Sequence, residues 1–336
     1  MQKIYLGVDV GGTKTAVVLS ARPPETMGRV EFATMPERGP QYALDHIVES
    51  GRSLLAQHGL GEDSIAAIGV SCGSPLDRVR GIVQAPPNLP TWVDVPICRL
   101  LGEAFHATCR LENDANAGAV AEHRFGAGKG SDHMIFLTLG TGLGAGIIAA
   151  GSLYLGANGD AGEIGHVRLS PTGPVGYHKA GSIEGWASGG GIAQLAVRML
   201  AQAEKRGRSS MLHAQMAQGG LTARDVGIAA HAGDAVALSI LRSSGMRLGQ
   251  ALAMLIDVLN PQRIVLGGLA WRMGENLLAP MRRTMEREAL PQTLRACEIV
   301  PAALGEQIGD VSALCVAMGL EGKGANAASL SPPFEG

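Results

Sequence analysis

The amino-acid sequence predicts an α/β protein built from two related domains. An apolar strand over residues 3–10 ends in a glycine turn, and a second strand follows over residues 15–19. The same order of strand, polar and glycine-rich turn, and strand recurs over residues 134–150. A chain of 336 residues is long enough for two domains. The repeat therefore predicts duplicated domains, each with a hairpin turn suited to contact phosphate.

The spacing of apolar residues predicts the other elements. Strands are expected over residues 64–71, 107–112 and 263–266. Helices are expected over residues 43–58, 115–123, 191–206, 222–231, 234–259 and 309–319. Residues 73–92 are rich in Pro, Gly and Asn and are expected to form a loop. The polar tail, residues 325–336, is expected to be disordered.

Composition excludes several classes of protein. The net charge is -2 and the pI is about 6.5, so no basic surface for nucleic acid or an acidic membrane is expected. Aromatic residues make up only 4% of the chain, which disfavours base-stacking surfaces. The five cysteines are scattered without C-x-x-C spacing, so neither a disulfide framework nor a thiolate metal site is expected. We expect a cytoplasmic protein, since no apolar stretch is long enough for a signal or membrane span.

The first candidate site is the turn of the N-terminal hairpin, Asp9-Val10-Gly11-Gly12-Thr13-Lys14. Glycines let backbone N–H groups approach phosphate oxygens, and Thr13 adds a hydroxyl. Asp9 ends the strand and can hold Mg²⁺, which prefers few carboxylates together with phosphate. Lys14 faces either phosphate or solvent. The alternative is an ordinary hairpin turn, in which two glycines are common.

The second candidate site is the glycine-rich turn after the strand at residues 134–139. Its spacing also fits the dinucleotide fingerprint G-x-G-x-x-A, but that fingerprint opens a helix. The run that follows, GIIAAG, is short and strand-like, so a phosphate-binding hairpin is favoured over a dehydrogenase site. A P-loop is excluded because the G-K-[ST] ending is absent. The candidate residues are Thr138, Gly140, Thr141, Gly142 and Gly144.

The third candidate site is the segment Glu112-Asn113-Asp114-Ala115-Asn116, at a predicted strand-to-helix junction. A carboxylate there is well placed to accept a proton from a hydroxyl. In phosphoryl transfer the base takes the proton late, so an ordinary Asp pKa is sufficient. The alternative is that Asp114 only caps the helix. On this motif alone, capping is the simpler interpretation.

Two further segments carry polar or glycine-rich patterns. Glu163 and His166 lie between glycines, with Glu184 and Ser188 downstream, and such acceptors suit a polyhydroxylated ligand. The alternative is exposed loop charges and a histidine with a structural role. The strand at residues 263–266 ends in Gly267-Gly268, which can pass beneath an adenosine or simply form a strand-to-helix turn.

The order of these motifs resembles the ROK family (repressor, open reading frame, kinase). The resemblance covers roughly residues 4–320 and is carried by DVGGTK, PPNLPTW, ENDANAGAVAE, LTLGTGLGAGI, AGEIGHV, IEGWASG and IVLGG. It implies the actin-like ATPase (ribonuclease H-like) fold, with ATP and sugar in a cleft between two α/β domains. We expect a smaller domain over residues 1–117 with 318–336, and a larger one over residues 118–317.

The resemblance also implies roles for individual residues. Asp114 matches the catalytic base, and Asp9 would hold Mg²⁺ bound with ATP. The matching sugar contacts are Gly73, Asn88, Asn113, Asp114, Glu163, His166 and Glu184. The matching ATP contacts are Asp9, Gly11, Gly12, Thr13, Lys14, Thr138, Gly140, Thr141, Gly142, Gly144, Gly267 and Gly268.

One departure from the family is large. Most ROK proteins bind structural zinc through C-x-C-G-x-x-G-C-x-E and the histidine of the GH motif. Here the three cysteine positions are Val175, Tyr177 and Ser182, while His166 remains. We therefore expect no zinc. Packing of Val175 and Tyr177 and a hydrogen bond of Ser182 are expected to hold the loop instead. Leu269, where a third glycine is common, and the segment Gly305-Glu306-Gln307 also depart from the family.

The expected activity is ATP-dependent phosphorylation of a hexose, with glucose and its 6-hydroxyl as the leading substrate. The alternatives are N-acetylmannosamine or N-acetylglucosamine as the sugar, or a sugar-sensing ROK regulator without catalysis. The regulator is disfavoured because only eight residues precede the DVGGTK motif, which leaves no room there for a helix-turn-helix. The expected partners are the sugar and ATP, without nucleic acid or membrane. A homodimer is expected from the family resemblance.

Overall fold

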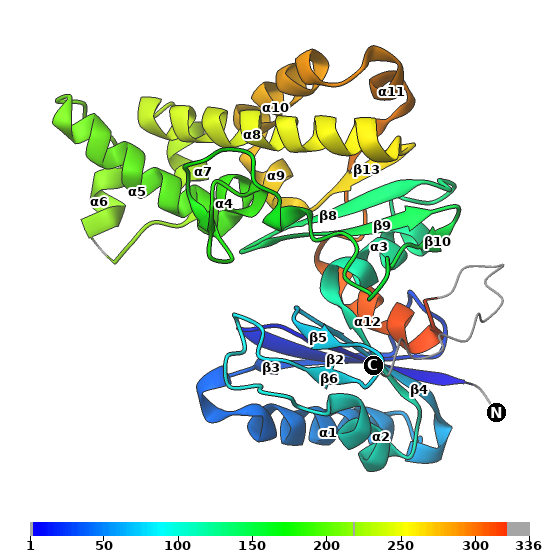
Figure 1. Ribbon diagram of the computed structural model, residues 1–336. Coiled ribbons are helices and arrows are strands. Elements are labelled where there is room, and N and C mark those ends of the chain that lie inside the picture. Colours follow the sequence, from blue (N-terminus) through cyan, green and yellow to red (C-terminus); the bar gives the residue numbers. More distant parts are fainter. Residues whose placement is uncertain (1–2, 218, 321–336) are drawn as a thin grey trace, which may run out of the picture.

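The computed structural model describes residues 3–217 and 219–320 and shows two α/β lobes, each built around a five-stranded sheet (Figure 1). The predicted disordered tail, residues 325–336, lies outside the described residues. In the first lobe the strand order is β3-β2-β1-β4-β7. The strands are β1 (Ile4–Val10), β2 (Lys14–Ser20), β3 (Gly28–Ala33), β4 (Ile65–Cys72) and β7 (Cys109–Asn113).

The second lobe repeats this arrangement with the order β10-β9-β8-β13-β14. The strands are β8 (Met134–Leu139), β9 (Leu143–Ala149), β10 (Ser152–Leu153), β13 (Arg263–Leu266) and β14 (Glu298–Pro301). In both sheets three strands pair antiparallel through tight turns, and two more continue the sheet in parallel. The equivalent order agrees with the internal repeat in the sequence.

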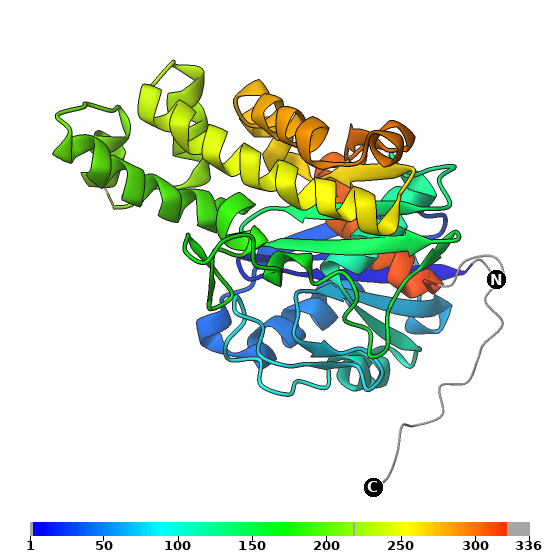
Figure 2. The same cartoon turned by 45° about the horizontal axis from the view of Figure 1, so that its top comes forward.

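Helices cover the outer faces of the sheets, and two helices lie between the lobes (Figures 1 and 2). The first sheet is covered by α1 (Pro40–Gln57) and α2 (Ile97–Phe105). Between the lobes, α3 (Asp114–Phe125) packs on β8 and β9, and α12 (Ile308–Met318) packs on β1 and β4. The outer helices of the second lobe are α4 (Ile183–Ala187), α5 (Gly189–Lys205), α6 (Leu212–Ala217), α7 (Ala223–His231), α8 (Ala235–Leu259), α9 (Gly268–Met273), α10 (Glu275–Glu288) and α11 (Pro291–Ala296).

Each lobe has its own hydrophobic core, and a third cluster joins α3 to α12. The first core surrounds buried side chains such as Leu6, Ile68 and Phe105, and the second surrounds Ile240, Leu252 and Ile264. Gly69 lets α12 lie directly on β4, because a Cβ at that position would be 2.2 Å from the Ala313 carbonyl oxygen. The close contact brings the start of α12 beside the carboxyl end of β1.

Several elements were not predicted from the sequence. The segment 73–92, expected as a loop, contains the small hairpin of β5 (Leu76–Asp77) and β6 (Ile82–Val83). A second small hairpin, β11 (Val175–Gly176) and β12 (Lys179–Ala180), lies in the expected sugar-binding region. Short 3₁₀ turns occupy η1 (Pro36–Arg38), η2 (Glu62–Ser64), η3 (Ile164–His166) and η4 (Gly305–Gln307). Among the helices in the described ranges, none is both long and apolar enough to cross a membrane.

Candidate active site

The turn between β1 and β2 is held in place by Thr34. The Thr34 hydroxyl donates to the Gly11 carbonyl at 2.7 Å, and its backbone N–H donates to the Thr13 carbonyl at 3.0 Å. Gly12 packs on Asn88, since a Cβ on Gly12 would lie 2.6 Å from the Asn88 Cβ. Asn88 itself is exposed. The predicted phosphate turn and a predicted sugar contact therefore lie side by side.

Lys14 does not face the turn in this structure. Its side chain is 66% exposed and pairs with Glu31 at 3.0 Å. Glu31 also pairs with Arg29, whose Nε donates to Asp310 at 2.8 Å. Of the two orientations open for Lys14, the structure shows the one toward solvent and Glu31.

Asp9 lies at the carboxyl end of β1, opposite Ser71 on the parallel strand β4. Burial, together with the nearby carboxylates of Asp114 and Asp310, raises the pKa of Asp9 to about 7, against a hydrogen bond with Ser71 that lowers it. The backbone of Gly309 at the start of α12 is so close that a Cβ there would be 2.1 Å from the Asp9 carboxylate. Asp9 is thus a confined carboxylate beside a glycine turn and other acids.

Asn113, not Asp114, supplies the main cap of helix α3. Its side-chain oxygen accepts hydrogen bonds from the backbone N–H groups of Ala115 at 2.9 Å and Asn116 at 3.3 Å. Its amide nitrogen donates to the Ser74 hydroxyl at 2.7 Å. Asp114 accepts the Ala115 N–H at 2.8 Å. It therefore contributes less to the cap of α3 than Asn113 does.

Asp114 is open to solvent, yet protein atoms surround it on most sides. The resulting loss of solvation raises its pKa, while the backbone N–H groups of Ala115 and Asp114 lower it. The Asp114 charge also contributes to raising the pKa of Asp9 and of Glu163. The three carboxylates therefore lie close enough to influence one another.

The turn between β8 and β9 is braced by α4 and α5. The backbone N–H groups of Gly189 and Gly190 donate to the carbonyls of Gly140 and Thr141 at 2.8 and 3.1 Å. Within the turn, the Thr138 hydroxyl accepts the Gly144 N–H at 3.2 Å. Gly140 has open space where a Cβ would point, so its backbone is accessible. This turn occupies the same position in its sheet as the Gly11 turn does in the first sheet.

Glu184 connects this turn to the predicted sugar ligands. Its carboxylate accepts the backbone N–H of Leu143 at 3.1 Å. Gly165 lies against both, since a Cβ on it would be 2.2 Å from the Leu143 carbonyl oxygen and 3.5 Å from the Glu184 Cβ. Burial, followed by the charges of Asp160, Asp114 and Glu184, raises the pKa of Glu163. Both predicted sugar-binding glutamates therefore gather next to the second phosphate turn.

His166 ends the short turn η3, and its ring is exposed. Gly73 lies beside Asn88, with 3.7 Å between a Cβ built on Gly73 and the Asn88 amide oxygen. Gly267 lies at the end of β13, where its N–H donates to Leu137 at 2.8 Å, and Gly268 begins α9. Gly267-Gly268 is thus a strand-to-helix turn next to β8, an arrangement compatible with both interpretations made from the sequence.

The hypothesis about the loop that lacks cysteines is partly wrong. Val175 and Tyr177 are exposed by 45% and 55%, so they do not hold the loop by packing inside it. Ser182 does make the expected hydrogen bond, because its buried hydroxyl accepts the Gly185 N–H at 3.1 Å. Gln194 adds a contact that was not predicted: its amide bonds both the N–H and the carbonyl of Val175, at 2.9 and 2.8 Å.

Sequence reasoning missed the partner that supports the predicted base. Glu112 is 1% exposed and pairs with Arg78 at 2.9 Å. Its other oxygen accepts the Asn113 N–H at 2.9 Å and the Asn116 side-chain amide at 3.1 Å. Because Arg78 lies 34 residues away, in the β5–β6 hairpin, no local pattern indicates the pair.

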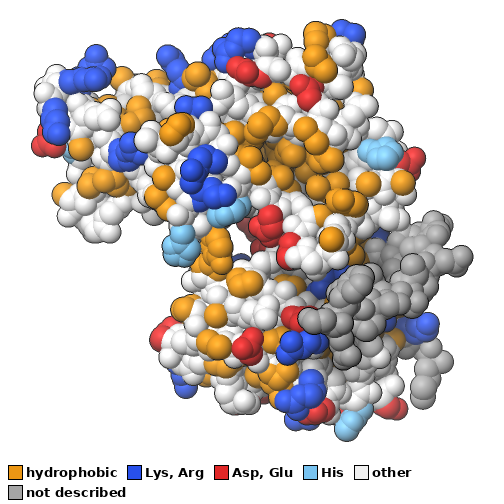
Figure 3. All heavy atoms as spheres, in the orientation of Figure 1, with side chains coloured by type: hydrophobic (Ala, Val, Ile, Leu, Met, Phe, Trp, Pro, Cys, Tyr) orange, Lys and Arg blue, Asp and Glu red, His pale blue; other side chains and the backbone are white. Residues whose placement is uncertain are grey.

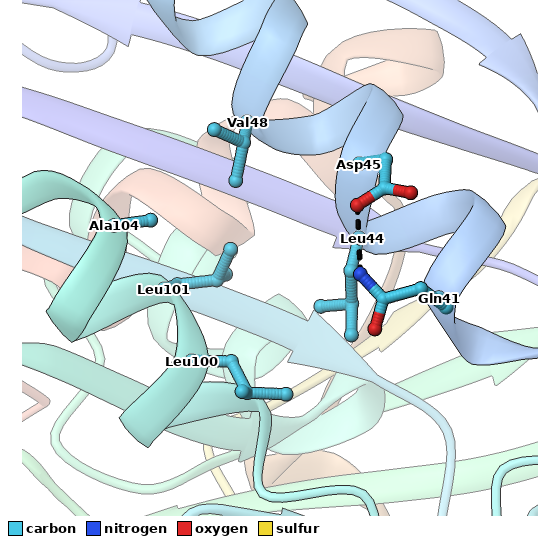
Figure 4. A pocket seen from close by; sticks show the side chains of 7 residues that line it. All are labelled: Gln41, Leu44, Asp45, Val48, Leu100, Leu101 and Ala104. Carbon is cyan, nitrogen blue, oxygen red and sulfur yellow. Dashed lines mark hydrogen bonds between the residues drawn. The ribbon is translucent and has the colours of Figure 1, made fainter.

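The predicted site residues surround a hollow between the lobes. Figure 3 shows acidic side chains at its wall, with histidine and hydrophobic side chains at its edge. The pocket drawn in Figure 4 is a different feature, lined by Gln41, Leu44, Asp45, Val48, Leu100, Leu101 and Ala104 between α1 and α2. It contains none of the predicted site residues. The predicted phosphate turns, the three acids and the sugar-binding candidates instead meet where the lobes face each other.

Comparisons with known proteins bear on the family and the fold. The chain is 34% identical over 307 residues to a glucokinase of Halalkalibacterium halodurans, covering 91% of this chain and 92% of that protein. It is 33% identical to the bifunctional enzyme NanE/NanK of Brucella melitensis, covering 90% of this chain and 52% of that protein. A ROK family glucokinase of Streptomyces griseus, solved with glucose and AMPPNP, superposes with a TM-score of 0.74 at 30% identity, covering 94% and 99% of the two chains. The actin-like ATPase fold expected from the sequence is thereby confirmed. Because the model of the ROK family matches residues 5–319, the chain belongs to that family.

Proposed function

We propose that this ROK sugar kinase transfers the γ-phosphoryl group of ATP to a hexose hydroxyl, with Asp114 as the general base. The observation that carries the proposal is that Asn113 and Asp114 have different roles at the start of α3. Asn113 accepts two backbone N–H groups and caps the helix, so the cap does not depend on Asp114. Asp114 is exposed to solvent, and its carboxylate can accept a proton from a bound hydroxyl.

The raised pKa of Asp114 suits this role. A more basic carboxylate accepts the hydroxyl proton more readily. The hydrogen bond from Ala115 fixes the direction of the carboxylate. The oxygen of the sugar attacks the γ-phosphorus as its proton passes to Asp114, and ADP leaves.

The residues around Asp9 fit a magnesium–nucleotide complex. The pKa of the Asp9 carboxylate is raised by burial and by two neighbouring acids, and a divalent cation would offset this repulsion. Mg²⁺ is commonly held by one or two carboxylates plus phosphate oxygens. Mg²⁺ would neutralise phosphate charge there. The backbone of the Gly11–Gly12 and Gly140–Gly142 turns would contact the phosphates, and Gly267-Gly268 would lie on the adenosine side. Lys14 would contact phosphate only after leaving Glu31.

Glucose is the leading sugar because glucokinases are found among the relatives. Glu163, Glu184, His166 and Asn113 would bind its hydroxyls, with Gly73 and Asn88 at the rim. N-acetylmannosamine is the second candidate, supported by the similarity to a protein named NanE/NanK. Such acceptors discriminate against ligands that lack a hydroxyl, because the site would then keep unpaired polar groups.

A coupled assay of ADP release with glucose, mannose and both N-acetylhexosamines tests the proposal. Asp114→Asn should lower kcat by about 10²–10⁴-fold, the usual contribution of a general base. It should leave sugar binding by calorimetry within about threefold and the melting temperature unchanged, since Asn113 still caps α3. The matched control is Asp132→Asn, which removes an exposed carboxylate just before β8, at the opposite end of that strand from the glycine turn. Turnover by Asp114→Asn at the wild-type rate would refute the assignment of the base.

We further propose a homodimer and a cytoplasmic location. Helix α8 carries exposed apolar side chains that a second copy could cover, namely Met246, Met254, Val258 and Leu259, which are 42%, 41%, 79% and 38% exposed. Figure 3 shows a broad hydrophobic area on the upper lobe.

A further inference from the structure

The hairpin of β11 and β12 has an unusual turn. Its two central residues, Tyr177 and His178, have φ angles of 37° and 63°. A two-residue turn with both φ angles positive normally contains Asn-Gly, because other side chains are strained in this region. Here two aromatic side chains occupy it. Strained residues of this kind gather at ligand-binding sites, so the turn warrants a functional explanation.

The hairpin is fixed directly on two of the proposed sugar ligands. Gly176 packs on Glu184, since a Cβ there would lie 2.8 Å from the Glu184 Cβ. The Lys179 ammonium donates to the His166 carbonyl at 2.8 Å. The two hydrogen bonds between Gln194 and the Val175 backbone attach the hairpin to α5. The turn is therefore held at a set position beside Glu184 and His166.

The Tyr177 ring lies next to the His166 ring. Their centroids are 6.0 Å apart in an edge-on arrangement, and the His178 ring lies 5.4 Å from the Tyr177 ring. Tyr177 remains 55% exposed, and no hydrogen bond of its hydroxyl is recorded in the described part of the chain. An aromatic ring that is held by its turn, yet neither buried nor hydrogen-bonded, has a free surface for a ligand.

We propose that Tyr177 is a specificity-determining residue that forms the wall of the sugar site on the His166 side. Small-molecule sites combine aromatic surfaces with a few polar groups that fix orientation. His166 and Glu184 supply the polar groups, and the ring of Tyr177 supplies a flat apolar surface for the C–H groups of a hexose. The inference rests on the proposed function, because it requires His166 and Glu184 to bind sugar.

A purely local role for Tyr177 predicts different behaviour. If the ring only stabilised the turn, replacement by a residue that prefers positive φ would preserve function. Asn tolerates this conformation well and removes the ring. Tyr177→Asn therefore separates the ring from the backbone conformation. Tyr177→Phe keeps the ring and removes only the hydroxyl.

The test measures steady-state kinetics of the full chain with glucose and N-acetylmannosamine. Tyr177→Asn should raise the KM for the preferred sugar about tenfold, equivalent to about 1.4 kcal/mol. Its kcat and its KM for ATP should stay within twofold of wild type, and its preference between the two sugars should change. Tyr177→Phe should behave like wild type. Val175→Thr, in the same hairpin, is the control and should change none of these values.

The outcomes distinguish this inference from the proposed function. If the wild type phosphorylates a sugar and Tyr177→Asn keeps its KM and its sugar preference, the inference is wrong and the proposed function stands. If the wild type has no activity, the same variants are compared by calorimetric titration with both sugars. Loss of affinity in Tyr177→Asn would then support the inference without catalysis. Equal affinity, or no binding by the wild type, would overturn it.

Discussion

Replacing Glu112 by Gln should destabilise the protein and disturb the position of Asp114. The Glu112 carboxylate receives hydrogen bonds from three donors: the Arg78 guanidinium, the Asn113 N–H and the Asn116 amide. The side chain is 1% exposed, so water cannot replace a lost partner there. A Gln side chain has a single acceptor oxygen and brings an NH₂ group that must face one of these donors.

The expected loss follows from these contacts. A buried donor left unsatisfied costs about 1–3 kcal/mol. Removing one charge of a buried ion pair costs about 3–5 kcal/mol, but Arg78 is 26% exposed and can recover part of its solvation. The free energy of unfolding should therefore fall by about 2–4 kcal/mol. Since Asn113 caps α3 and precedes Asp114, kcat should fall as well.

Urea denaturation of the wild type and variant measures this loss. The matched control is Glu103→Gln, which removes an exposed pair with Arg99 in which the side chains are 61% and 62% exposed. The control should change the free energy of unfolding by less than about 0.5 kcal/mol. A combined Glu112→Gln and Arg78→Met variant should recover part of the loss, because the unpaired charge is gone. If Glu112→Gln matched the control, the three-donor network would not stabilise the fold.

Two other predictions concern pH and assembly. The folded-state pKa of Asp9 is raised from 3.8 to about 7, so the stability linked to its protonated form is present below pH 3.8 and lost as pH rises through 7. If Asp9 holds Mg²⁺ as proposed, MgATP binding needs its ionised form, so the KM for ATP should rise below pH 7. Asp310→Asn removes one of the like charges and should move this rise to lower pH, and an unchanged pH profile would contradict the coupling. For assembly, sedimentation velocity should show a dimer for the wild type and a monomer for Val258→Asp, which places a charge on the 79% exposed Val258; a monomeric wild type would exclude the dimer.

Sequence patterns predicted the elements whose signals are local. The strand at residues 263–266 and the long helix ending at residue 259 agree with β13 and α8 because their apolar spacing is continuous. Strand β3 was missed because it is short and only alternately half-buried at the sheet edge. Helix α10 was missed because Pro280 lies inside it and its other residues are largely charged or polar. Tertiary packing decides whether these two segments form a strand and a helix, and the local pattern carries no information about that packing.

Within the candidate site, the sequence indicated candidate residues but not their contacts. Glycine turns and carboxylates are visible as motifs, so Gly12, Gly140 and Asp114 could be selected from the chain alone. Their contacts join distant segments, as when Gly12 meets Asn88 or Leu143 donates to Glu184. Which of Asn113 and Asp114 caps the helix depends on side-chain rotation, which the pattern Asn-Asp leaves open.

The distribution of site residues between the lobes bears on how the site is assembled. Asp9 and Asp114 stand at the carboxyl ends of β1 and β7, in one sheet, so their separation is fixed by that sheet. Glu163, His166 and Glu184 belong to the other lobe, where Glu184 accepts the Leu143 N–H. A rigid rotation of the lobes would therefore keep the proposed base and the proposed magnesium ligand at the same separation while changing their distance to the proposed sugar ligands. Closure on sugar binding would then complete the sugar site around an Asp114 carboxylate already oriented by the Ala115 N–H, and would exclude water from the reaction once the sugar is bound.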